Sequence, residues 1–421
     1  MRCLNVFIEL NGTPVPVGSI KGNDSSDASF SYSPDYLNMP GARPISISLP
    51  LRSDPFGPEL TRSYFEGLLP EGFLKMTVAR NMRIEENDYL TILAGLGREC
   101  LGAVMILEEG SPVPSPSYER LTIEDIRNLA REGAARSVQL VTQAHLSLAG
   151  ASGKAGLYYD EDNMQWYVPL GTAPSTHIVK QSHIRLDDIV TNEQLSLLTG
   201  QKLGLNVPES HIINTGDAGE GQVLFAAKRY DRVIGENSRV INGLKAPLRL
   251  HQEDFAQALG IPSAGKYESD GESHMKDMFA LLRRYSSDPI GDQLRLWDIV
   301  IFDWLIGNTD SHIKNLSLLY GKGLSGIRLA PAYDILSTAI YSSSTREMAF
   351  AIGGERSLDR ITRQHFAQAA RDCGLGERMA LKRFDDMAAG FEKALSLTAE
   401  ELRGRGFERA LKLKERILAI R

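Results

Sequence analysis

The sequence changes from strand-rich to helix-rich near residue 250, and this order restricts the fold more than any other feature. Residues 1–50 contain short apolar strands and turns, and residues 140–235 contain further strands with one helix among them. After about residue 250, apolar residues recur mainly at helical spacing. Strands followed by a long helical region predict an α+β fold with a β-rich N-terminal part and an all-α C-terminal lobe.

The clearest helical segment is DQLRLWDIVIFDWLIGN, residues 292–308. Its apolar residues at i, i+3 and i+4 spacing predict a buried helix, and Gly307 is expected to end it. The residues on the apolar face are Leu294, Trp297, Ile301, Trp304 and Leu305. The polar stretch IGNTDSHIKN, residues 306–315, is therefore predicted to be a loop that follows a core helix.

Length and local composition suggest how the chain is divided. A chain of 421 residues is expected to form two or three domains. A Pro/Ser-rich stretch near residues 108–120 suits a boundary, and the predicted parts are 1–110, 111–235 and 236–421. Within the first part, the period-two stretch Ile45 to Leu49 predicts a half-buried strand.

Charge and cysteine usage exclude several classes of protein. A net charge of −6 argues against a protein built mainly to coat nucleic acid, although a local basic patch remains compatible with it. Three distant cysteines provide no disulfide framework and fit a reducing compartment. The N-terminus does not resemble a signal peptide, and no apolar run is long enough for a membrane helix. We expect a cytoplasmic protein without a membrane partner.

Two features in the middle of the chain would suit binding of a triphosphate. The stretch AGASGK, residues 149–154, lies between two predicted strands, where small residues let backbone N–H groups approach a phosphate closely. Lys180 closes the apolar strand THIVK, so its ammonium group needs an anionic partner. Nucleotide phosphates would serve, with Glu193 on the next helix as a possible orienting carboxylate.

Two features in the helical region would complete a site for phosphoryl transfer. Asp310 and Asn315 lie five positions apart, the interval at which kinases place the carboxylate that accepts a hydroxyl proton and the asparagine that holds a metal. Asp334 follows Asn315 by 19 positions, where kinases place a second metal ligand. Oxygen ligands beside a phosphate suit Mg²⁺.

Each of these features also has an ordinary structural explanation. A tight hairpin uses glycine, an edge-strand lysine can face water, a capped turn can follow a helix, and an isolated loop aspartate commonly has no role. The joint order of glycine loop, strand lysine, helical glutamate, Asp/Asn loop and later aspartate is more specific than any one of them. It favours the interpretation of residues 306–315 as a catalytic loop.

The sequence resembles a known family, the HipA-type persistence toxins. These are bacterial serine/threonine protein kinases of type II toxin–antitoxin modules. The matching stretches run along nearly the whole chain in the same order: ARPISISLPL, FEGLLPEG, GRECLGAVMI, LSLAGASGK, STHIVK, KLGLNVP, KRYDR, GIPSAGKYESDGE, GNTDSHIKN and LAPAYDI. The resemblance implies a two-lobed fold like that of protein kinases and phosphoinositide kinases, with residues 1–110 as a HipA N-terminal subdomain, 111–235 as the kinase N-lobe and 236–421 as the C-lobe.

The resemblance also implies roles for individual residues. The catalytic base falls on Asp310, and the Mg²⁺ ligands fall on Asn315 and Asp334. The family's autophosphorylated serine falls on Ser147, where a phosphate would add about −1.5 to −2 charges, displace the nucleotide loop and switch the enzyme off. The residues implied to contact ATP are Ala149, Gly150, Ala151, Ser152, Gly153, Lys154, Lys180, Lys228, Arg229, Tyr230, His312, Ile313, Lys314, Asn315 and Tyr333.

This chain departs from the family pattern at three places. Ser152 stands where the family commonly has a longer glutamine, and Lys228 stands where an acidic hinge residue is usual. Residues 352–363 read IGGERSLDRITR and lack the lysine-rich loop by which a family member touches operator DNA. We therefore expect operator DNA to be reached only through the antitoxin.

The leading hypothesis is an ATP- and Mg²⁺-dependent serine/threonine protein kinase that arrests growth and causes persistence. The resemblance implies a small helix-turn-helix antitoxin, similar to HipB, as its partner and an aminoacyl-tRNA synthetase, by family precedent the glutamyl enzyme, as its substrate. Two alternatives remain open from the residues alone. One is a HipA-like corepressor with weak or lost catalysis, and the other is a kinase for a lipid or small molecule.

Overall fold

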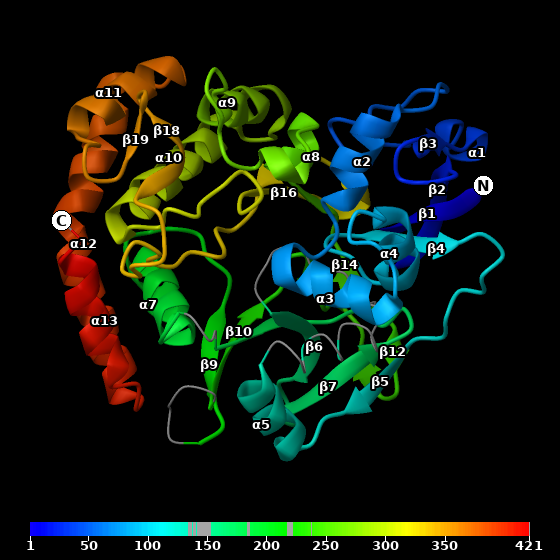
Figure 1. Cartoon of the computed structure of the whole chain (residues 1–421), viewed down its shortest axis with the longest axis horizontal. Coiled ribbons are helices and arrows are strands. Elements are labelled where there is room, and N and C mark those ends of the chain that lie inside the picture. The colour runs from blue at the N-terminus through cyan, green and yellow to red at the C-terminus, as the bar shows by residue number, and fades with distance from the viewer. Residues whose placement is uncertain are drawn as a thin grey trace. The chain divides into compact units, whose positions relative to one another are not determined.

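The structure, a computed structural model, describes residues 1–133, 137, 140, 153–182, 186–216, 222–236 and 238–420 (Figure 1). The chain divides into two compact units, each assembled from separate segments. The first unit comprises residues 1–181, 226–263 and 319–325, and the second comprises residues 182–225, 264–318 and 326–421. Because each unit is built from three separate segments, the division does not follow sequence order.

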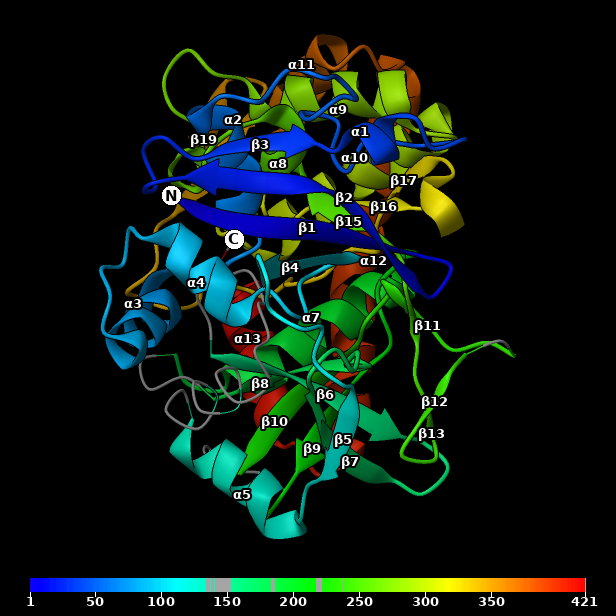
Figure 2. The ribbon, with the colours of Figure 1, turned by 90° about the vertical axis from the view of Figure 1, so that its right-hand side faces the viewer.

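The first unit begins with a four-stranded antiparallel sheet of order β3-β2-β1-β4 (Figure 2). Leu4 of β1 pairs with Ile20 of β2 on one side and with Glu108 of β4 on the other. The strands and helices of this part are β1 (Arg2–Leu10), β2 (Thr13–Gly22), β3 (Ser29–Tyr32), α1 (Pro34–Leu37), α2 (Pro58–Glu66), α3 (Gly72–Met82), α4 (Tyr89–Leu96) and β4 (Val104–Glu108). Alternate residues of β1 enter the core, as a half-covered sheet requires.

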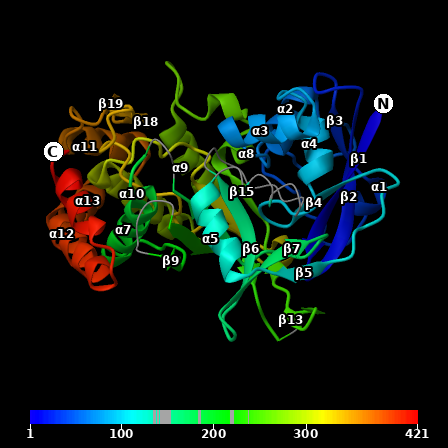
Figure 3. The same ribbon diagram turned by 60° about the horizontal axis from the view of Figure 1, so that its bottom comes forward.

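A second sheet follows, and its first three strands stand next to one another in Figure 3. Within the first unit the neighbours are β5, β7, β6, β8 and the end of β10, in that order, and within the second unit β9 lies next to the start of β10. The elements are β5 (Ser117–Arg120), α5 (Ile123–Glu132), β6 (Lys154–Asp160), β7 (Gln165–Leu170), β8 (His177–Gln181), β9 (Ser210–Asn214) and β10 (Val223–Lys228).

Short strands complete the first unit after β10. They form two small hairpin-like pairs, β11 with β14 and β12 with β13, and they lead into a short helix. The elements are β11 (Arg232–Val233), β12 (Val240–Ile241), β13 (Leu244–Lys245), β14 (Leu248–Arg249), β15 (Gln252–Asp254), α8 (Phe255–Leu259) and the 3₁₀ turn η2 (Lys322–Leu324).

The expected strand at residues 45–49 is wrong. The segment is a tight turn in which Ser46 and Leu49 form only an isolated bridge. The cause is a buried carboxylate from far along the chain: Glu253 accepts hydrogen bonds from the Ser46 hydroxyl at 2.5 Å and from the Ile47 N–H at 3.1 Å. Satisfying that buried group outweighs the period-two pattern.

The second unit is mainly helical, and its helices pack around aromatic side chains. Trp297 and Trp304 of α10 both pack against Phe366, with ring centroids 5.7 and 5.4 Å apart, and the Trp297 indole N–H donates to the Ala380 carbonyl. The helices are α7 (Ile189–Lys202), α9 (His274–Tyr285), α10 (Pro289–Ile306), α11 (Arg363–Asp372), α12 (Glu377–Gly404) and α13 (Arg409–Leu418). The core helix predicted over residues 292–308 is confirmed, and it ends at Gly307 in the left-handed conformation.

Short strands also occur in this region, so residues 236–421 are not entirely helical. The strands are β16 (Ser317–Tyr320), β17 (Ile327–Leu329), β18 (Glu347–Ile352) and β19 (Glu355–Ser357), and a 3₁₀ turn, η1 (Ser263–Gly265), precedes α9. The predicted α+β class is confirmed by the mixture of sheets and helices. Among the described residues, every helix is too short or too polar to cross a lipid bilayer.

Candidate active site

Two of the predicted phosphate-binding lysines lie opposite each other in the first unit. In the antiparallel pair of β6 and β8, Lys154 is the partner of Lys180. Residues directly opposite in such a pair project from the same face of the sheet. Lys154 is buried and Lys180 half-buried, so this face concentrates two ammonium groups where phosphate oxygens could neutralise both.

The rest of the predicted nucleotide loop can be located only in part. Gly153 precedes β6 in irregular backbone, directly before Lys154. The other loop residues, Ala149 to Ser152, and the predicted phosphorylation site Ser147 lie outside the described residues.

The predicted hinge residues follow β10 in the first unit. Lys228 forms an exposed ion pair with Glu161, with Nζ and Oε1 2.9 Å apart, and the Tyr230 hydroxyl donates to the Gln252 side chain. Arg229 is buried, and its backbone N–H donates to the Thr176 carbonyl at 2.8 Å. Its guanidinium group therefore points into the protein.

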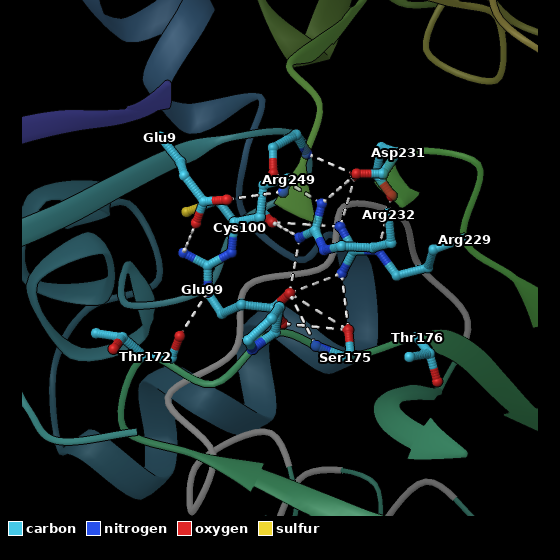
Figure 4. A network of polar contacts seen from close by, with 12 residues as sticks. Glu9, Glu99, Cys100, Thr172, Ser175, Thr176, Arg229, Asp231, Arg232 and Arg249 are labelled. Carbon is cyan, nitrogen blue, oxygen red and sulfur yellow. Dashed lines mark hydrogen bonds and ion pairs between the residues drawn. The ribbon is translucent and has the colours of Figure 1, made fainter. Parts of the chain in front are cut away.

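Figure 4 shows the buried network that receives the Arg229 guanidinium. Arg229 donates to both carboxylate oxygens of Asp231 at 2.9 and 2.7 Å and to Glu99 at 3.1 Å. Arg232 donates to the same Glu99 oxygen at 2.7 Å and to Asp231 at 2.9 Å. Burial alone would raise the pKa of Asp231, but the two guanidinium groups prevail and lower it to about 2. The hinge is thereby tied to Glu99, which lies just before β4.

The loop with the predicted catalytic base lies in the second unit, and the buried Asp303 carboxylate accepts hydrogen bonds from two of its residues. The Ser311 hydroxyl donates to Asp303 Oδ2 at 2.5 Å, and the Asn308 amide donates to Oδ1 at 2.8 Å. Burial raises the pKa of Asp303 to about 7, although both hydrogen bonds act in the opposite direction. Asp303 fixes both sides of the turn that presents Asp310.

Asp310 and Asn315 are joined by a hydrogen bond across this loop. The Asn315 Nδ2 group donates to the Asp310 backbone carbonyl at 2.9 Å, and the His312 N–H donates to the same carbonyl at 2.8 Å. Asp310 is exposed while its neighbours on both sides are buried. Because Nδ2 is committed to the backbone, the oxygen of the Asn315 amide is left as the acceptor that can face a cation.

The segment after the second predicted metal ligand is attached to this loop. The Thr309 N–H donates to the Thr338 hydroxyl oxygen at 2.7 Å, and the Thr338 N–H donates to the Gly307 carbonyl at 3.0 Å. These contacts hold Thr338 against the start of the loop that contains Asp310.

Tyr333 and Asp334 lie in the chain a few residues before Thr338. The Tyr333 hydroxyl is within 2.6 Å of the Ser317 hydroxyl and donates to the Lys314 carbonyl at 3.2 Å, so it braces the loop that contains the predicted nucleotide contacts His312 to Asn315. Asp334 has a φ of +58°, in the left-handed region that residues with a Cβ seldom adopt. Such strained residues concentrate at functional sites.

The oxygen donors in this unit suit a magnesium ion that is also held by phosphates. Asn315 and Asp334 offer an amide oxygen and a carboxylate, and Mg²⁺ in phosphoryl-transfer sites is bound by one or two protein ligands together with substrate oxygens. Among the residues that the structure describes, no group of three or more His, Cys, Asp and Glu side chains could hold a metal by itself. Glu193, the predicted orienting carboxylate, is buried in α7.

Reasoning from the sequence missed two sets of residues. The first is Tyr267, whose hydroxyl donates a hydrogen bond to the Asp310 carboxylate although it lies 43 positions earlier in the chain. Its stretch, GIPSAGKYESDGE, carried the family resemblance but suggested no role for Tyr267. The buried network around Glu99 was also missed, because charged residues predict ion pairs only once the fold brings them together. The stretches GRECLG and KRYDR were the available signal, since each places charges beside apolar strands.

Comparisons with known proteins identify the family that this chain resembles. The model of a family described as "HipA-like C-terminal domain" matches residues 146–395, and that of the "HipA N-terminal domain" matches residues 7–107. The chain is 31% identical over 392 residues to Y4mE, a protein of Sinorhizobium fredii that is named as a kinase. This match covers 91% of this chain and 90% of Y4mE.

Two further comparisons match the chain over most of its length. It is 24% identical to the serine/threonine-protein kinase toxin HipA of Shewanella oneidensis, covering 84% of this chain and 80% of that protein. A chain in the solved complex of Shewanella oneidensis HipA, HipB and operator DNA superimposes with a TM-score of 0.78 at 21% identity, covering 99% of this chain and 96% of that one. This second likeness shows that the two chains share a fold.

Proposed function

Because the chain belongs to the HipA-like family, we propose that it is an ATP- and Mg²⁺-dependent serine/threonine protein kinase and the toxin of a type II toxin–antitoxin module. The observation that carries this proposal is the loop in which Asn315 is hydrogen bonded to the Asp310 carbonyl while the Asp310 side chain is exposed. That arrangement presents a carboxylate to an incoming hydroxyl and leaves an amide oxygen for a metal.

In this proposal Asp310 acts as the general base. Its carboxylate accepts the proton of a serine or threonine hydroxyl while that oxygen attacks the γ-phosphorus of ATP. The bond between the γ-phosphorus and the bridging oxygen breaks, and ADP leaves. Asn315 and Asp334 would hold Mg²⁺, which neutralises phosphate charge. The strained backbone of Asp334 fits this role, because a fixed ligand needs no reorganisation.

The remaining residues bind ATP and orient it. Lys154 and Lys180, opposite each other on β6 and β8, supply positive charge for the phosphates. The nucleotide loop of Ala149 to Lys154 covers the phosphates. The segment Lys228 to Tyr230 meets the adenine through backbone and ring atoms, since the Arg229 guanidinium is used inside the protein. His312 to Asn315 and Tyr333 complete the contacts.

Regulation and partners follow the family in this proposal. Autophosphorylation of Ser147 would switch the enzyme off, because a phosphate there repels the phosphates of ATP. A small helix-turn-helix antitoxin similar to HipB would bind the toxin and bring the complex to operator DNA. The name and the solved complex of the Shewanella oneidensis proteins support that partner. A protein of translation, by family precedent glutamyl-tRNA synthetase, would be the substrate.

Inducible expression tests the proposal as a whole. Wild-type protein should arrest growth, co-expression of the antitoxin should restore growth, and Asp310→Asn should be harmless at the same protein level. Mass spectrometry of cellular proteins should then find phosphoserine or phosphothreonine that depends on Asp310. Growth arrest by Asp310→Asn, with no new phosphoprotein, would contradict the kinase toxin and favour a protein that acts by binding alone.

A further inference from the structure

Tyr267 contacts the carboxylate that the proposed mechanism uses as its base. Its hydroxyl donates a hydrogen bond to Asp310 Oδ1, and both residues belong to the second unit. Asp310 is exposed, so water could satisfy this oxygen, and yet a tyrosine from a distant segment does so. The contact therefore needs a reason other than compensation for burial.

The backbone next to Tyr267 is anchored unusually well. Glu268 is buried, its N–H donates to the Ala349 carbonyl at 2.9 Å, and its carbonyl accepts from Arg356 at 2.9 Å. Its carboxylate accepts from the Ala351 N–H at 2.9 Å and from the His274 N–H at 2.8 Å. Four hydrogen bonds at one residue attach the segment to β18, to β19 and to the start of α9, so Tyr267 stands on fixed backbone.

The ring of Tyr267 is held at a second point. It packs edge-to-face on His312, with ring centroids 5.1 Å apart and planes at 82°. The ring is 41% exposed, so it is not buried as a core side chain would be. With its backbone, ring and hydroxyl all fixed, Tyr267 presents its O–H to Asp310 in one direction.

This contact has a chemical consequence for a general base. A donor on Oδ1 fixes the rotation of the carboxylate about its Cβ–Cγ bond. The direction of the second oxygen is then fixed as well, and in the proposed mechanism the carboxylate accepts the proton of the acceptor hydroxyl. A base that is already oriented needs no rearrangement when the substrate arrives.

We propose that Tyr267 is a positioning residue for phosphoryl transfer: its hydroxyl orients the Asp310 carboxylate toward the acceptor hydroxyl. This inference rests on the proposed function, in which Asp310 is the base. It assigns Tyr267 no contact with ATP, so its contribution belongs to the chemical step.

Tyr267→Phe tests the proposal because it removes only the hydroxyl and keeps the ring that packs on His312. We expect kcat to fall at least about tenfold, as for loss of a hydrogen bond to a charged group. The KM for ATP should stay unchanged, because the Tyr267 hydroxyl orients the base and is assigned no contact with ATP. Tyr285→Phe is the matched control, because Tyr285 is also partly exposed, at 38%, in the same unit.

The outcomes separate this inference from the proposed function. If the wild type transfers no phosphate, the proposed function fails first. If the wild type is active and Tyr267→Phe keeps its kcat, Tyr267 has no positioning role. A higher kcat in the variant would also overturn the proposal, since the phenol would then be occupying the place of the acceptor. An unchanged unfolding midpoint in Tyr267→Phe establishes that each comparison is made between folded proteins.

Discussion

Lys154 of β6 stands directly opposite Lys180 of β8 in an antiparallel pair, so the two ammonium groups project from one face of the sheet. If phosphates bind there, Lys180→Met should lower ATP affinity by at least about tenfold, or roughly 1.4 kcal/mol, while the fold is retained. ATP-dependent thermal stabilisation measures this directly. Lys202→Met removes the same charge from an exposed pair with Glu401 and should bind ATP normally. Equal stabilisation of both variants would remove Lys180 from the phosphate site.

The network in Figure 4 predicts a large stability effect at Glu99. Glu99→Gln leaves Arg229 and Arg232 buried with one carboxylate between them, and loss of one partner from a buried ion pair typically costs 3–5 kcal/mol, so we expect about that loss. Urea unfolding measures it. Arg127→Met breaks an exposed pair with Glu124 in the same unit and should change the unfolding free energy by less than about 1 kcal/mol. Similar losses in both variants would contradict the assigned importance of burial.

Asp303 predicts how stability depends on pH. Burial raises its pKa to about 7 in the folded protein, so the folded state binds a proton that the unfolded state has released above about pH 4. The contribution is fully present below about pH 4 and is lost as pH rises to about 7, by on the order of 4 kcal/mol. Asp303→Asn cannot ionise, so the difference in unfolding free energy between wild type and variant should change between pH 5 and pH 7.5. A constant difference over that range would contradict a raised pKa.

The C-terminal helix α13 predicts a distant effect on the segment after Asp334. Arg416 donates to the Ile340 carbonyl at 3.0 Å and forms an ion pair with Asp187 at 3.1 Å, and the Tyr341 hydroxyl donates to the Asp187 carbonyl. Arg416→Met removes two of these contacts, so we expect faster hydrogen exchange in residues 338–346 and a several-fold lower kcat. Lys412→Met, on the same helix, is the control. Unchanged exchange in Arg416→Met would show that other contacts suffice to hold the segment.

Local sequence patterns predicted the parts of the fold that depend on local physics. The helix of residues 289–306 and its end at Gly307 follow from apolar spacing and from a glycine that can adopt a positive φ. The segment at residues 45–49 did not follow its period-two pattern, because the carboxylate that shapes it, Glu253, lies about 200 residues away in the chain. No local pattern contains that information.

The residues of the candidate site also fall into those that local spacing predicts and those that only distant contacts bring together. Asp310, Asn315 and Asp334 were predicted from their spacing in the sequence, and their roles stay a prediction. Tyr267 was missed because only the docking of Glu268 against β18 brings its hydroxyl to Asp310. The Arg229 side chain enters a buried network whose other half comes from Glu99, and the local sequence of the predicted hinge does not contain that contact. Contacts between distant segments are what the sequence alone could not supply.

Phosphate transfer from γ-labelled ATP by the purified protein is the most direct measurement of the central claim, that Asp310 is the base of a kinase. With a cell lysate as the source of acceptor proteins, wild type should label serine or threonine, and Asp310→Asn should do so about a thousandfold more slowly, which corresponds to about 4 kcal/mol of barrier. Asp386→Asn, an exposed change in the same unit, should behave as wild type. Transfer by Asp310→Asn at nearly the wild-type rate would contradict the account.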